Sequence, residues 1–197
     1  MSQTLYHRRI NNRSSLRYYL GLVARLKKHL YYSFTRFIAK KNGASIGECS
    51  VISFSLAKRA NINLTVGSHT SIQTDLIDLR APVKIGNNVI ISSGVEIITC
   101  SHDIDSAEWE FKPYGIEIED YAWIATRVFI LPSCRKISKG AVCAAGSVVV
   151  RNVEEMIVVG GNPATFIKYR KEVHSNLIVE SLLSGDFKQY KIEWKNK

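Results

Sequence analysis

The chain has 197 residues, 46% of them apolar, so a single core can bury most of its apolar surface without a disulfide or a metal ion. No apolar run approaches the roughly 18 residues that a membrane-spanning helix needs, and the polar first residues do not resemble a signal peptide. We therefore expect a cytoplasmic protein. Its net charge of +10 comes from residues 1–47, which hold ten basic residues and no acidic one.

The first predicted element is a helix over residues 15–40, in one or two pieces, within a basic segment of residues 1–43. Its apolar residues recur at spacings of three and four, as in an amphipathic helix: Leu16, Tyr19, Leu20, Val23, Leu26, Leu30, Phe34, Phe37 and Ile38.

Two roles are open for this helix. In the preferred one, Leu16, Leu20, Val23, Leu30 and Phe34 cap the open end of the domain that follows, because the end of a repeat stack must be covered. In the other, the basic helix makes weak peripheral contact with the anionic inner face of a membrane. Nucleic acid is not an expected partner, since nothing resembles a base-reading module.

The central segment, residues 44–163, has an aliphatic residue at every sixth position over long stretches. A period of six fits neither an α-helix nor a simple strand, but it fits a short strand and a turn on each face of a triangular prism. A β-sandwich, whose strands recur every 8–12 residues, is the less consistent alternative. We predict a mainly β protein built as a parallel β-helix, with these inward positions: Ile46, Ile52, Val66, Ile72, Leu79, Ile85, Ile91, Ile97, Ile118, Ile124, Ile130, Ile137, Cys143 and Val149.

The repeat is interrupted by an insert near residues 99–116, which is rich in ionisable and aromatic side chains. Insertions in repeat proteins form loops on one face, often the binding face, so the insert is expected to carry function. The plainer alternative is a tolerated surface loop.

The last segment, residues 164–197, is predicted as a C-terminal helix and tail. Asn162-Pro163 ends the repeat, and Ser184-Gly185-Asp186 ends the helix. The helix is expected over residues 164–184, with an apolar side formed by Ile167, Val173, Leu177, Ile178, Leu182 and Leu183.

Three stretches carry a resemblance to a known family: IGNNVIISSGVEIITCSHD, IEIEDYAWIATRVFILPSCRKISKGAVCAAGSVVVRNV and VVGGNPATFIKYR. In this order they resemble the hexapeptide-repeat acyltransferases, closest to the bacterial sugar and exopolysaccharide O-acetyltransferases, over roughly residues 46–170. The resemblance implies a left-handed coil, a homotrimer, and acetyl-CoA bound in a groove between subunits. It also implies transfer of the acetyl group to a sugar hydroxyl in cell-surface polysaccharide biosynthesis.

Two other functions are kept open. One is N-acetylation of a nucleotide-linked amino sugar or of a small xenobiotic, and the other is a non-catalytic β-helix scaffold.

His102 of the SHD motif is the expected catalytic base. A sugar hydroxyl is a poor nucleophile, so a base must take its proton as it attacks the thioester, and imidazole suits this task at neutral pH. The acceptor attacks directly, with no protein nucleophile. Glu110 precedes the tryptophan of the AWIA motif, and the resemblance implies that the residue at this position orients His102. Other insert carboxylates or a backbone carbonyl are alternatives.

By motif position, the resemblance also implies the acetyl-CoA contacts. The thioester end would lie at Trp123, Ala125 and Thr126, and the pantetheine arm at Ala145 and Gly146. The nucleotide and its phosphates would lie toward Arg151, Thr165 and Lys168. Ala125 stands where the family usually has glycine, which puts the local turn shape in doubt.

No metal site is expected. The cysteines form no CxxC pair, and they are predicted to be small buried residues in a reducing compartment: Cys49, Cys100, Cys134 and Cys143. Zinc carbonic anhydrases share the implied fold and need three histidines, but the repeat region offers only His69 and His102.

Overall fold

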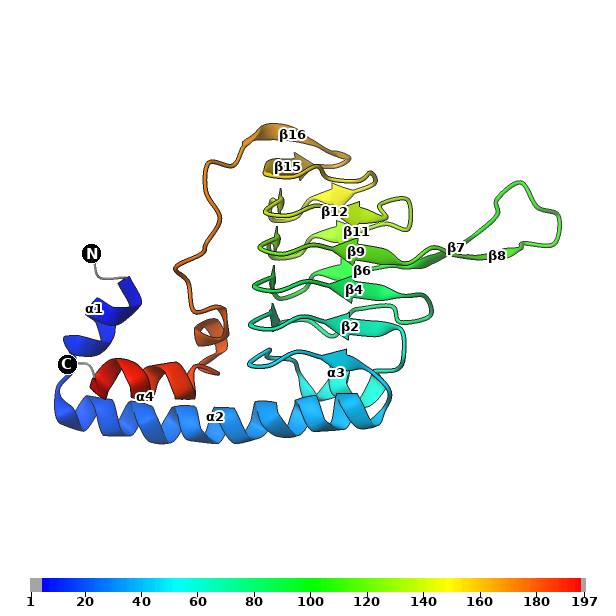
Figure 1. Ribbon diagram of the computed structural model, residues 1–197. Helices are drawn as coiled ribbons and strands as arrows, with labels where there is room; N and C mark the ends of the chain where they lie inside the picture. The colour runs from blue at the N-terminus through cyan, green and yellow to red at the C-terminus, as the bar shows by residue number, and fades with distance from the viewer. Residues whose placement is uncertain (1–4, 196–197) are drawn as a thin grey trace.

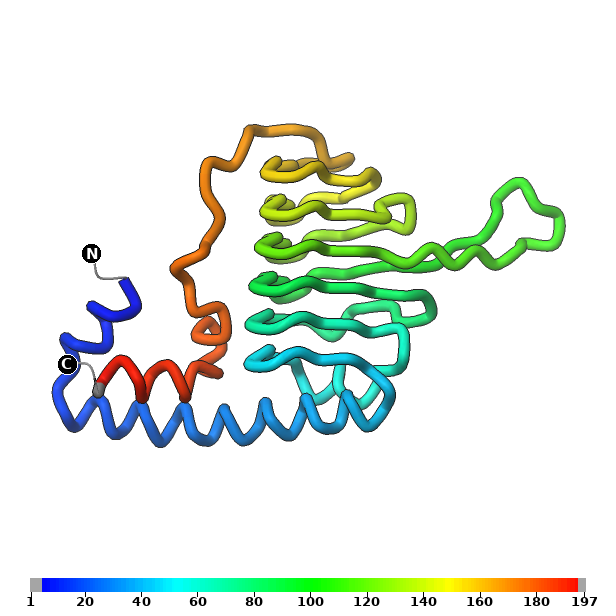
Figure 2. Tube along the Cα trace, in the orientation of Figure 1, coloured from blue at the N-terminus to red at the C-terminus, as the bar shows by residue number. Residues whose placement is uncertain are grey.

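The structure is a computed structural model that describes residues 5–195 (Figures 1 and 2). Its body is a stack of coils whose short strands form three parallel sheets around one core. The first sheet has the order β1 (Ser45–Ile46), β2 (Leu64–Val66), β4 (Val83–Ile85), β9 (Ile116–Ile118) and β12 (Lys136–Ile137). The second has β3 (Ser71–Ile72), β5 (Ile90–Ile91), β10 (Trp123–Ile124), β13 (Val142–Cys143) and β15 (Ile157–Gly161), and the third has β6 (Glu96–Ile97), β11 (Phe129–Ile130) and β14 (Val148–Val149).

The chain visits the first, second and third sheets in turn, so each coil has three corners. We call the corner between the first and second sheets the first corner, that between the second and third the second corner, and that between the third and first the third corner. Equivalent residues of successive coils pair in register, as Ile91 does with Ile124 and Ile124 with Cys143. The parallel β-helix predicted from the period of six is confirmed at this level.

The core consists of the inward residues that the six-residue period predicts. Ile52, Ile91, Ile118, Ile124 and Ile130 are each fully buried, and all belong to one apolar cluster that runs the length of the stack. No single coil encloses such a side chain alone, so stacking of coils creates the core.

Shortening one of these side chains is expected to be costly. Ile124 lies on β10, with coils on both sides of it, and Ile124→Ala should lower the free energy of unfolding by about 2–5 kcal/mol. Ile62→Ala, at a position 82% exposed, is the matched control and should change it by less than about 0.5 kcal/mol. Urea unfolding measures both, and equal losses would contradict the assignment of the core.

The first corner is built by close backbone contacts and a ladder of hydroxyl groups. A Cβ atom on Gly67 would lie 2.6 Å from the carbonyl carbon of Gly86, so this position requires glycine. The Ser50 hydroxyl donates to the Gly67 carbonyl at 2.6 Å, and the Thr70 hydroxyl donates to the Gly86 carbonyl at 2.8 Å. These bonds satisfy buried turn carbonyls between adjacent coils.

Three helices lie at the N-terminal end: α1 (Leu5–Asn11), α2 (Ser15–Lys41) and α3 (Phe54–Arg59). The predicted helix over residues 15–40 is confirmed as α2. Ser14 caps it by accepting a hydrogen bond from the Arg17 backbone amide. Ala39 of α2 and Leu56 of α3 join the main core and close the end of the stack.

The prediction of which α2 residues cap the stack is wrong. The residues proposed for capping are 52–71% exposed: Leu16, Leu20, Val23, Leu30 and Phe34. The buried residues of the helix are instead Tyr18, Tyr32, Thr35 and Ala39. An apolar stripe shows that a helix is amphipathic, but here another face is buried, with Ala39 in the main core and Tyr18 packed against Tyr190.

The helix predicted over residues 164–184 is also wrong. Residues 164–169 form strand β16 (Ala164–Tyr169), antiparallel to β15, so the exposed edge of the last coil is covered by a strand. A 3₁₀ helix, η1, follows at Val179–Leu183, and the C-terminal helix α4 begins only at Phe187 (Phe187–Lys195).

Residues 170–186, here called the strap, descend along the first corner from β16 to α4 (Figure 1). Arg170 donates to the carbonyls of Tyr121 at 3.0 Å and Gly140 at 2.9 Å, on adjacent coils. His174 Nε2 lies 2.7 Å from the Asn88 carbonyl. The strap therefore follows the corner by contacts to successive turns.

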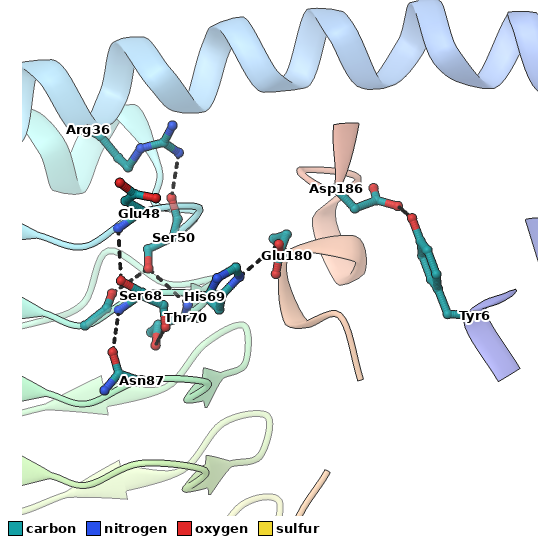
Figure 3. A network of polar contacts seen from close by, with 11 residues as sticks. Tyr6, Arg36, Glu48, Ser50, Ser68, His69, Thr70, Asn87, Glu180 and Asp186 are labelled. Atoms are coloured by element: carbon teal, nitrogen blue, oxygen red, sulfur yellow. Dashed lines mark hydrogen bonds and ion pairs between the residues drawn. The ribbon is translucent and has the colours of Figure 1, made fainter. Parts of the chain in front are cut away.

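Further down, Glu180 pairs with His69 at 3.1 Å (Figure 3). Asp186 pairs with Arg25 of α2 at 3.0 Å. The strap thus ties the last coil to the N-terminal helices. Among the helices formed by residues 5–195, none is both long and apolar enough to cross a bilayer.

Candidate active site

His102 lies on a hairpin that extends from the third corner, away from the stacked coils (Figure 1). The hairpin consists of β7 (Cys100–His102) and β8 (Phe111–Pro113), and it is the predicted insert. The His102 ring stacks on Trp109, with ring centroids 4.9 Å apart, and meets the edge of Phe111 at 5.8 Å. Aromatic side chains of the insert thus hold the histidine ring in place.

The hydrogen bond of His102 fixes which of its nitrogens can act as a base. Nδ1 lies 2.8 Å from the backbone carbonyl oxygen of Trp109. A carbonyl oxygen only accepts, so Nδ1 carries the hydrogen and donates it. Nε2 of the neutral ring then holds the free lone pair, which is the form a general base needs.

The carboxylate of Glu110 is engaged elsewhere. It lies 3.6 Å from the ammonium of Lys112, which also pairs with Asp103 at 2.9 Å. The hydrogen bond from Lys112 lowers the pKa of Asp103, and the same pairing raises the pKa of Lys112. In the structure, Nδ1 of His102 thus bonds to the Trp109 carbonyl, which was among the alternatives, and Glu110 faces Lys112.

A groove of about 560 Å³ runs over the second sheet and the second corner. Five residues expected to contact acetyl-CoA line it: Trp123, Ala125, Thr126, Ala145 and Lys168. The small alanine side chains leave space for a ligand in the groove. Lys168 of β16 places a positive charge at its edge. The groove combines a flat apolar surface with positive charge, which suits a ligand that has both an apolar arm and phosphates.

The other three expected contacts lie outside this lining. Gly146 follows Ala145 in the same turn, with a φ of +71° and open space where a Cβ would be. Thr165 is exposed on β16 opposite Gly160, and Arg151 is exposed after β14 of the third sheet. A ligand would have to extend beyond the groove to reach them.

The groove continues into a second hollow of about 410 Å³ through the shared residues Ser92, Trp123 and Arg170. His174, Leu177 and Leu182 of the strap line its far side. Sequence reasoning missed Arg170 and His174 as lining residues because both fall within the helix that it expected over residues 164–184. Arg170 and His174 are four residues apart, which in a helix only places them on the same face. This spacing gave no sign that both side chains face the coils.

Burial keeps His174 neutral. Its pKa lies below 6.5, chiefly because burial disfavours the charged ring and also because Arg170 lies nearby. Nδ1 is 2.9 Å from the Arg170 guanidinium, which can only donate, so Nε2 carries the hydrogen and donates it to the Asn88 carbonyl. Protonation of Nδ1 would remove the acceptor that Arg170 uses.

The strap should therefore lose stability in acid. The unfolded chain takes up a proton at His174 near pH 6.5, whereas the folded chain resists it, so this contribution is present above pH 6.5 and is lost as the pH falls below it. We expect the melting temperature to fall less between pH 8 and pH 5.5 in His174→Gln than in the wild type. Thermal unfolding at both pH values checks this, and equal falls would contradict it.

The strap also creates a cluster that the sequence did not predict. Cys49, His69 and Glu180 place one possible ligand atom each within 4.8 Å of one another. Glu180 is 4% exposed and pairs with His69, whereas burial and the nearby Glu180 raise the pKa of the Cys49 thiol. The raised pKa favours the protonated thiol, which is not the form that binds metal ions. Glu180 is far from the other two residues in sequence, so spacing rules for metal sites gave no sign of the cluster.

The base and the groove do not meet within one chain. His102 extends from the third corner, whereas the groove lies over the second sheet, on the opposite side of the coil. In a single copy, the groove and the hairpin are therefore separate features that do not adjoin.

Comparisons with known proteins give the following similarities. No family model matches the chain. Over 142 residues it is 31% identical to the putative colanic acid biosynthesis acetyltransferase WcaF of Escherichia coli, an alignment that covers 72% of this chain and 78% of that protein. It is 26% identical to the galactoside O-acetyltransferase of Lactococcus lactis over 66% of this chain, and it spans 58% of that relative.

Among solved structures, the fold is similar to that of a galactoside acetyltransferase in complex with coenzyme A. The TM-score is 0.51 and the sequence identity 20%, over 74% of this chain and 82% of that one.

Proposed function

Because the chain belongs to the hexapeptide-repeat acetyltransferases, we propose that it transfers an acetyl group from acetyl-CoA to a sugar hydroxyl, with His102 as the general base. The observation that carries this proposal is the hydrogen bond from His102 Nδ1 to the Trp109 carbonyl, since it leaves the lone pair of the neutral ring on Nε2. We further propose that the coils wind in the left-handed sense, as the resemblance implies.

The reaction needs no covalent intermediate on the protein. The acceptor hydroxyl attacks the thioester carbonyl while His102 Nε2 takes its proton. The carbon–sulfur bond then breaks, and the proton on Nε2 passes to the departing thiolate. The products are an acetyl ester and the free thiol of coenzyme A.

The groove over the second sheet is the proposed site for acetyl-CoA. WcaF and the galactoside enzymes are named as acetyltransferases, and one of the latter binds coenzyme A, which supports this assignment. Trp123, Ala125 and Thr126 would lie at the thioester end, and Ala145 and Gly146 along the pantetheine arm. Lys168, with Thr165 and Arg151 further out, would lie toward the phosphates.

The separation of base and groove in one chain supports an active homotrimer. In a closed three-fold assembly every copy can present its hairpin to the groove of the next, so that three identical sites form between neighbours. A monomer that is fully active at micromolar concentration by light scattering would overturn this part of the proposal.

The proposed acceptor is a sugar of a cell-surface polysaccharide or its precursor, as the name of WcaF suggests for that relative. Release of the coenzyme A thiol should be measured with a panel of sugars, nucleotide-linked amino sugars and small amines. Hydroxylamine cleaves an acetyl ester but leaves an amide, so product mass before and after treatment separates O- from N-acetylation. No thiol release with any acceptor would favour the scaffold alternative.

A further inference from the structure

The outward face of α2 carries a long row of exposed apolar side chains. Figure 1 shows α2 lying across one end of the coil stack, with the coils, the hairpin and α4 all on one side of it. Its buried residues face that side. Its other face carries a set of apolar side chains, here called the stripe, each 40–71% exposed: Leu16, Tyr19, Leu20, Val23, Leu26, Leu30, Phe34 and Phe37.

The stripe is continuous and straight. Its members recur mostly at spacings of three and four, so they lie on one side of the helix from Leu16 to Phe37, about 30 Å at 1.5 Å per residue. Scattered apolar residues on a protein surface need no explanation, but a contiguous face of this length marks an interaction surface. None of its members belongs to the main core, which α2 joins through Ala39 and the partly buried Ile38.

The charged residues near the stripe indicate which kind of partner would bind it. Residues 1–47 contain no acidic side chain. Three of their cations are used internally, since Arg25 pairs with Asp186, Arg36 donates to the Ser50 carbonyl, and Arg13 donates to the Tyr190 hydroxyl. The exposed ones are Arg8, Arg9, Arg17, Lys27, Lys28, Lys40 and Lys41.

We propose that α2 lies flat in the surface of an anionic lipid bilayer, with the stripe in the acyl boundary and the lysines and arginines against the headgroups. An apolar face bordered by cations fits this surface, which offers apolar depth and negative charge together. A second copy docked on the stripe would instead bring two cationic segments together without an acid to offset them. The orientation holds the coils, with the groove and hairpin, above the membrane.

Co-sedimentation of the full chain with vesicles tests the proposal, without acetyl-CoA or an acceptor. Vesicles of phosphatidylcholine with 30 mol% phosphatidylglycerol should bind the protein at 50 mM NaCl, whereas pure phosphatidylcholine or 500 mM NaCl should weaken binding at least about tenfold. No binding to the anionic vesicles at low salt would overturn the proposal. Because no reaction is measured, failure of the proposed acetyl transfer leaves this result intact.

Matched variants locate the binding surface. Val23→Ser with Leu30→Ser should lower the partition coefficient at least about tenfold, since both side chains leave the acyl boundary. Ile62→Ser with Ile104→Ser, at positions 82% and 80% exposed outside α2, should leave it unchanged. Equal effects of the two pairs would overturn the proposal.

Charge and assembly are tested in the same way. Lys40→Gln with Lys41→Gln should weaken binding to anionic vesicles about tenfold, whereas Lys84→Gln with Lys171→Gln should not. Light scattering is run on every variant. If the stripe variants lower the oligomeric state while vesicle binding is unchanged, a second copy covers the stripe and the proposal is wrong.

Discussion

Replacing His102 by alanine is expected to slow acetyl transfer by about two to four orders of magnitude, the usual contribution of a general base. The variant should still bind acetyl-CoA, because the groove lies elsewhere on the chain. It should also fold normally, since His102 contacts Trp109 and Phe111 within the hairpin and is not part of the main core. Initial rates of thiol release at saturating acetyl-CoA measure the loss.

Two further variants on the same hairpin make this result specific. Ile104→Ala changes a residue that is 80% exposed, and it should retain the wild-type rate. Glu110→Gln separates the two possible orienters of His102: a small effect is expected if the Trp109 carbonyl holds Nδ1, as in the structure. A loss as large as that of His102→Ala would return the orienting role to the carboxylate. A His102→Ala rate close to that of the wild type would remove the histidine from the mechanism.

The repeat domain could be predicted from sequence because its period is local and repeated. Each six-residue unit contributes one inward side chain, so errors in one unit, such as the break before Ile118, do not disturb the next. The same regularity placed Trp123, Ala125 and Ala145 near one another, since equivalent positions of successive coils stack in register. Five of the eight expected cofactor contacts accordingly line one groove.

The elements outside the repeats could not be predicted to this extent, because their environment is set by the assembled stack. The apolar spacing in residues 164–184 is that of a helix, but the open edge of β15 pairs with residues 164–169 as a strand instead. Likewise the pattern of α2 shows that it is amphipathic, but not that Tyr32 and Ala39, rather than Leu30 and Phe34, face the coils. In both segments tertiary contacts override a local pattern.

The arrangement of hairpin and groove leads to the second large effect, subunit complementation. Ala145→Trp should fill the groove, where Ala145 is exposed, and so block acetyl-CoA without disturbing the core. His102→Ala and Ala145→Trp should each be nearly inactive alone. Random 1:1 assembly of the two variants should restore about a quarter of the wild-type activity, because a working site then needs an intact His102 from one copy and an intact groove from the next.

The size of the recovery distinguishes the possible geometries. If His102 and the groove of the same chain formed each site, no mixture would contain a working one, and the activity would stay at the average of the two variants. Co-refolding the variants with different affinity tags, followed by tandem purification, isolates the mixed assemblies, in which about a third of the sites should work. Each variant refolded alone is the control for recovery caused by refolding itself. Activity restored only in the mixed assemblies would place the hairpin of one copy over the groove of its neighbour. This outcome is expected because the third corner, which carries His102, is separated from the second sheet, which carries the groove.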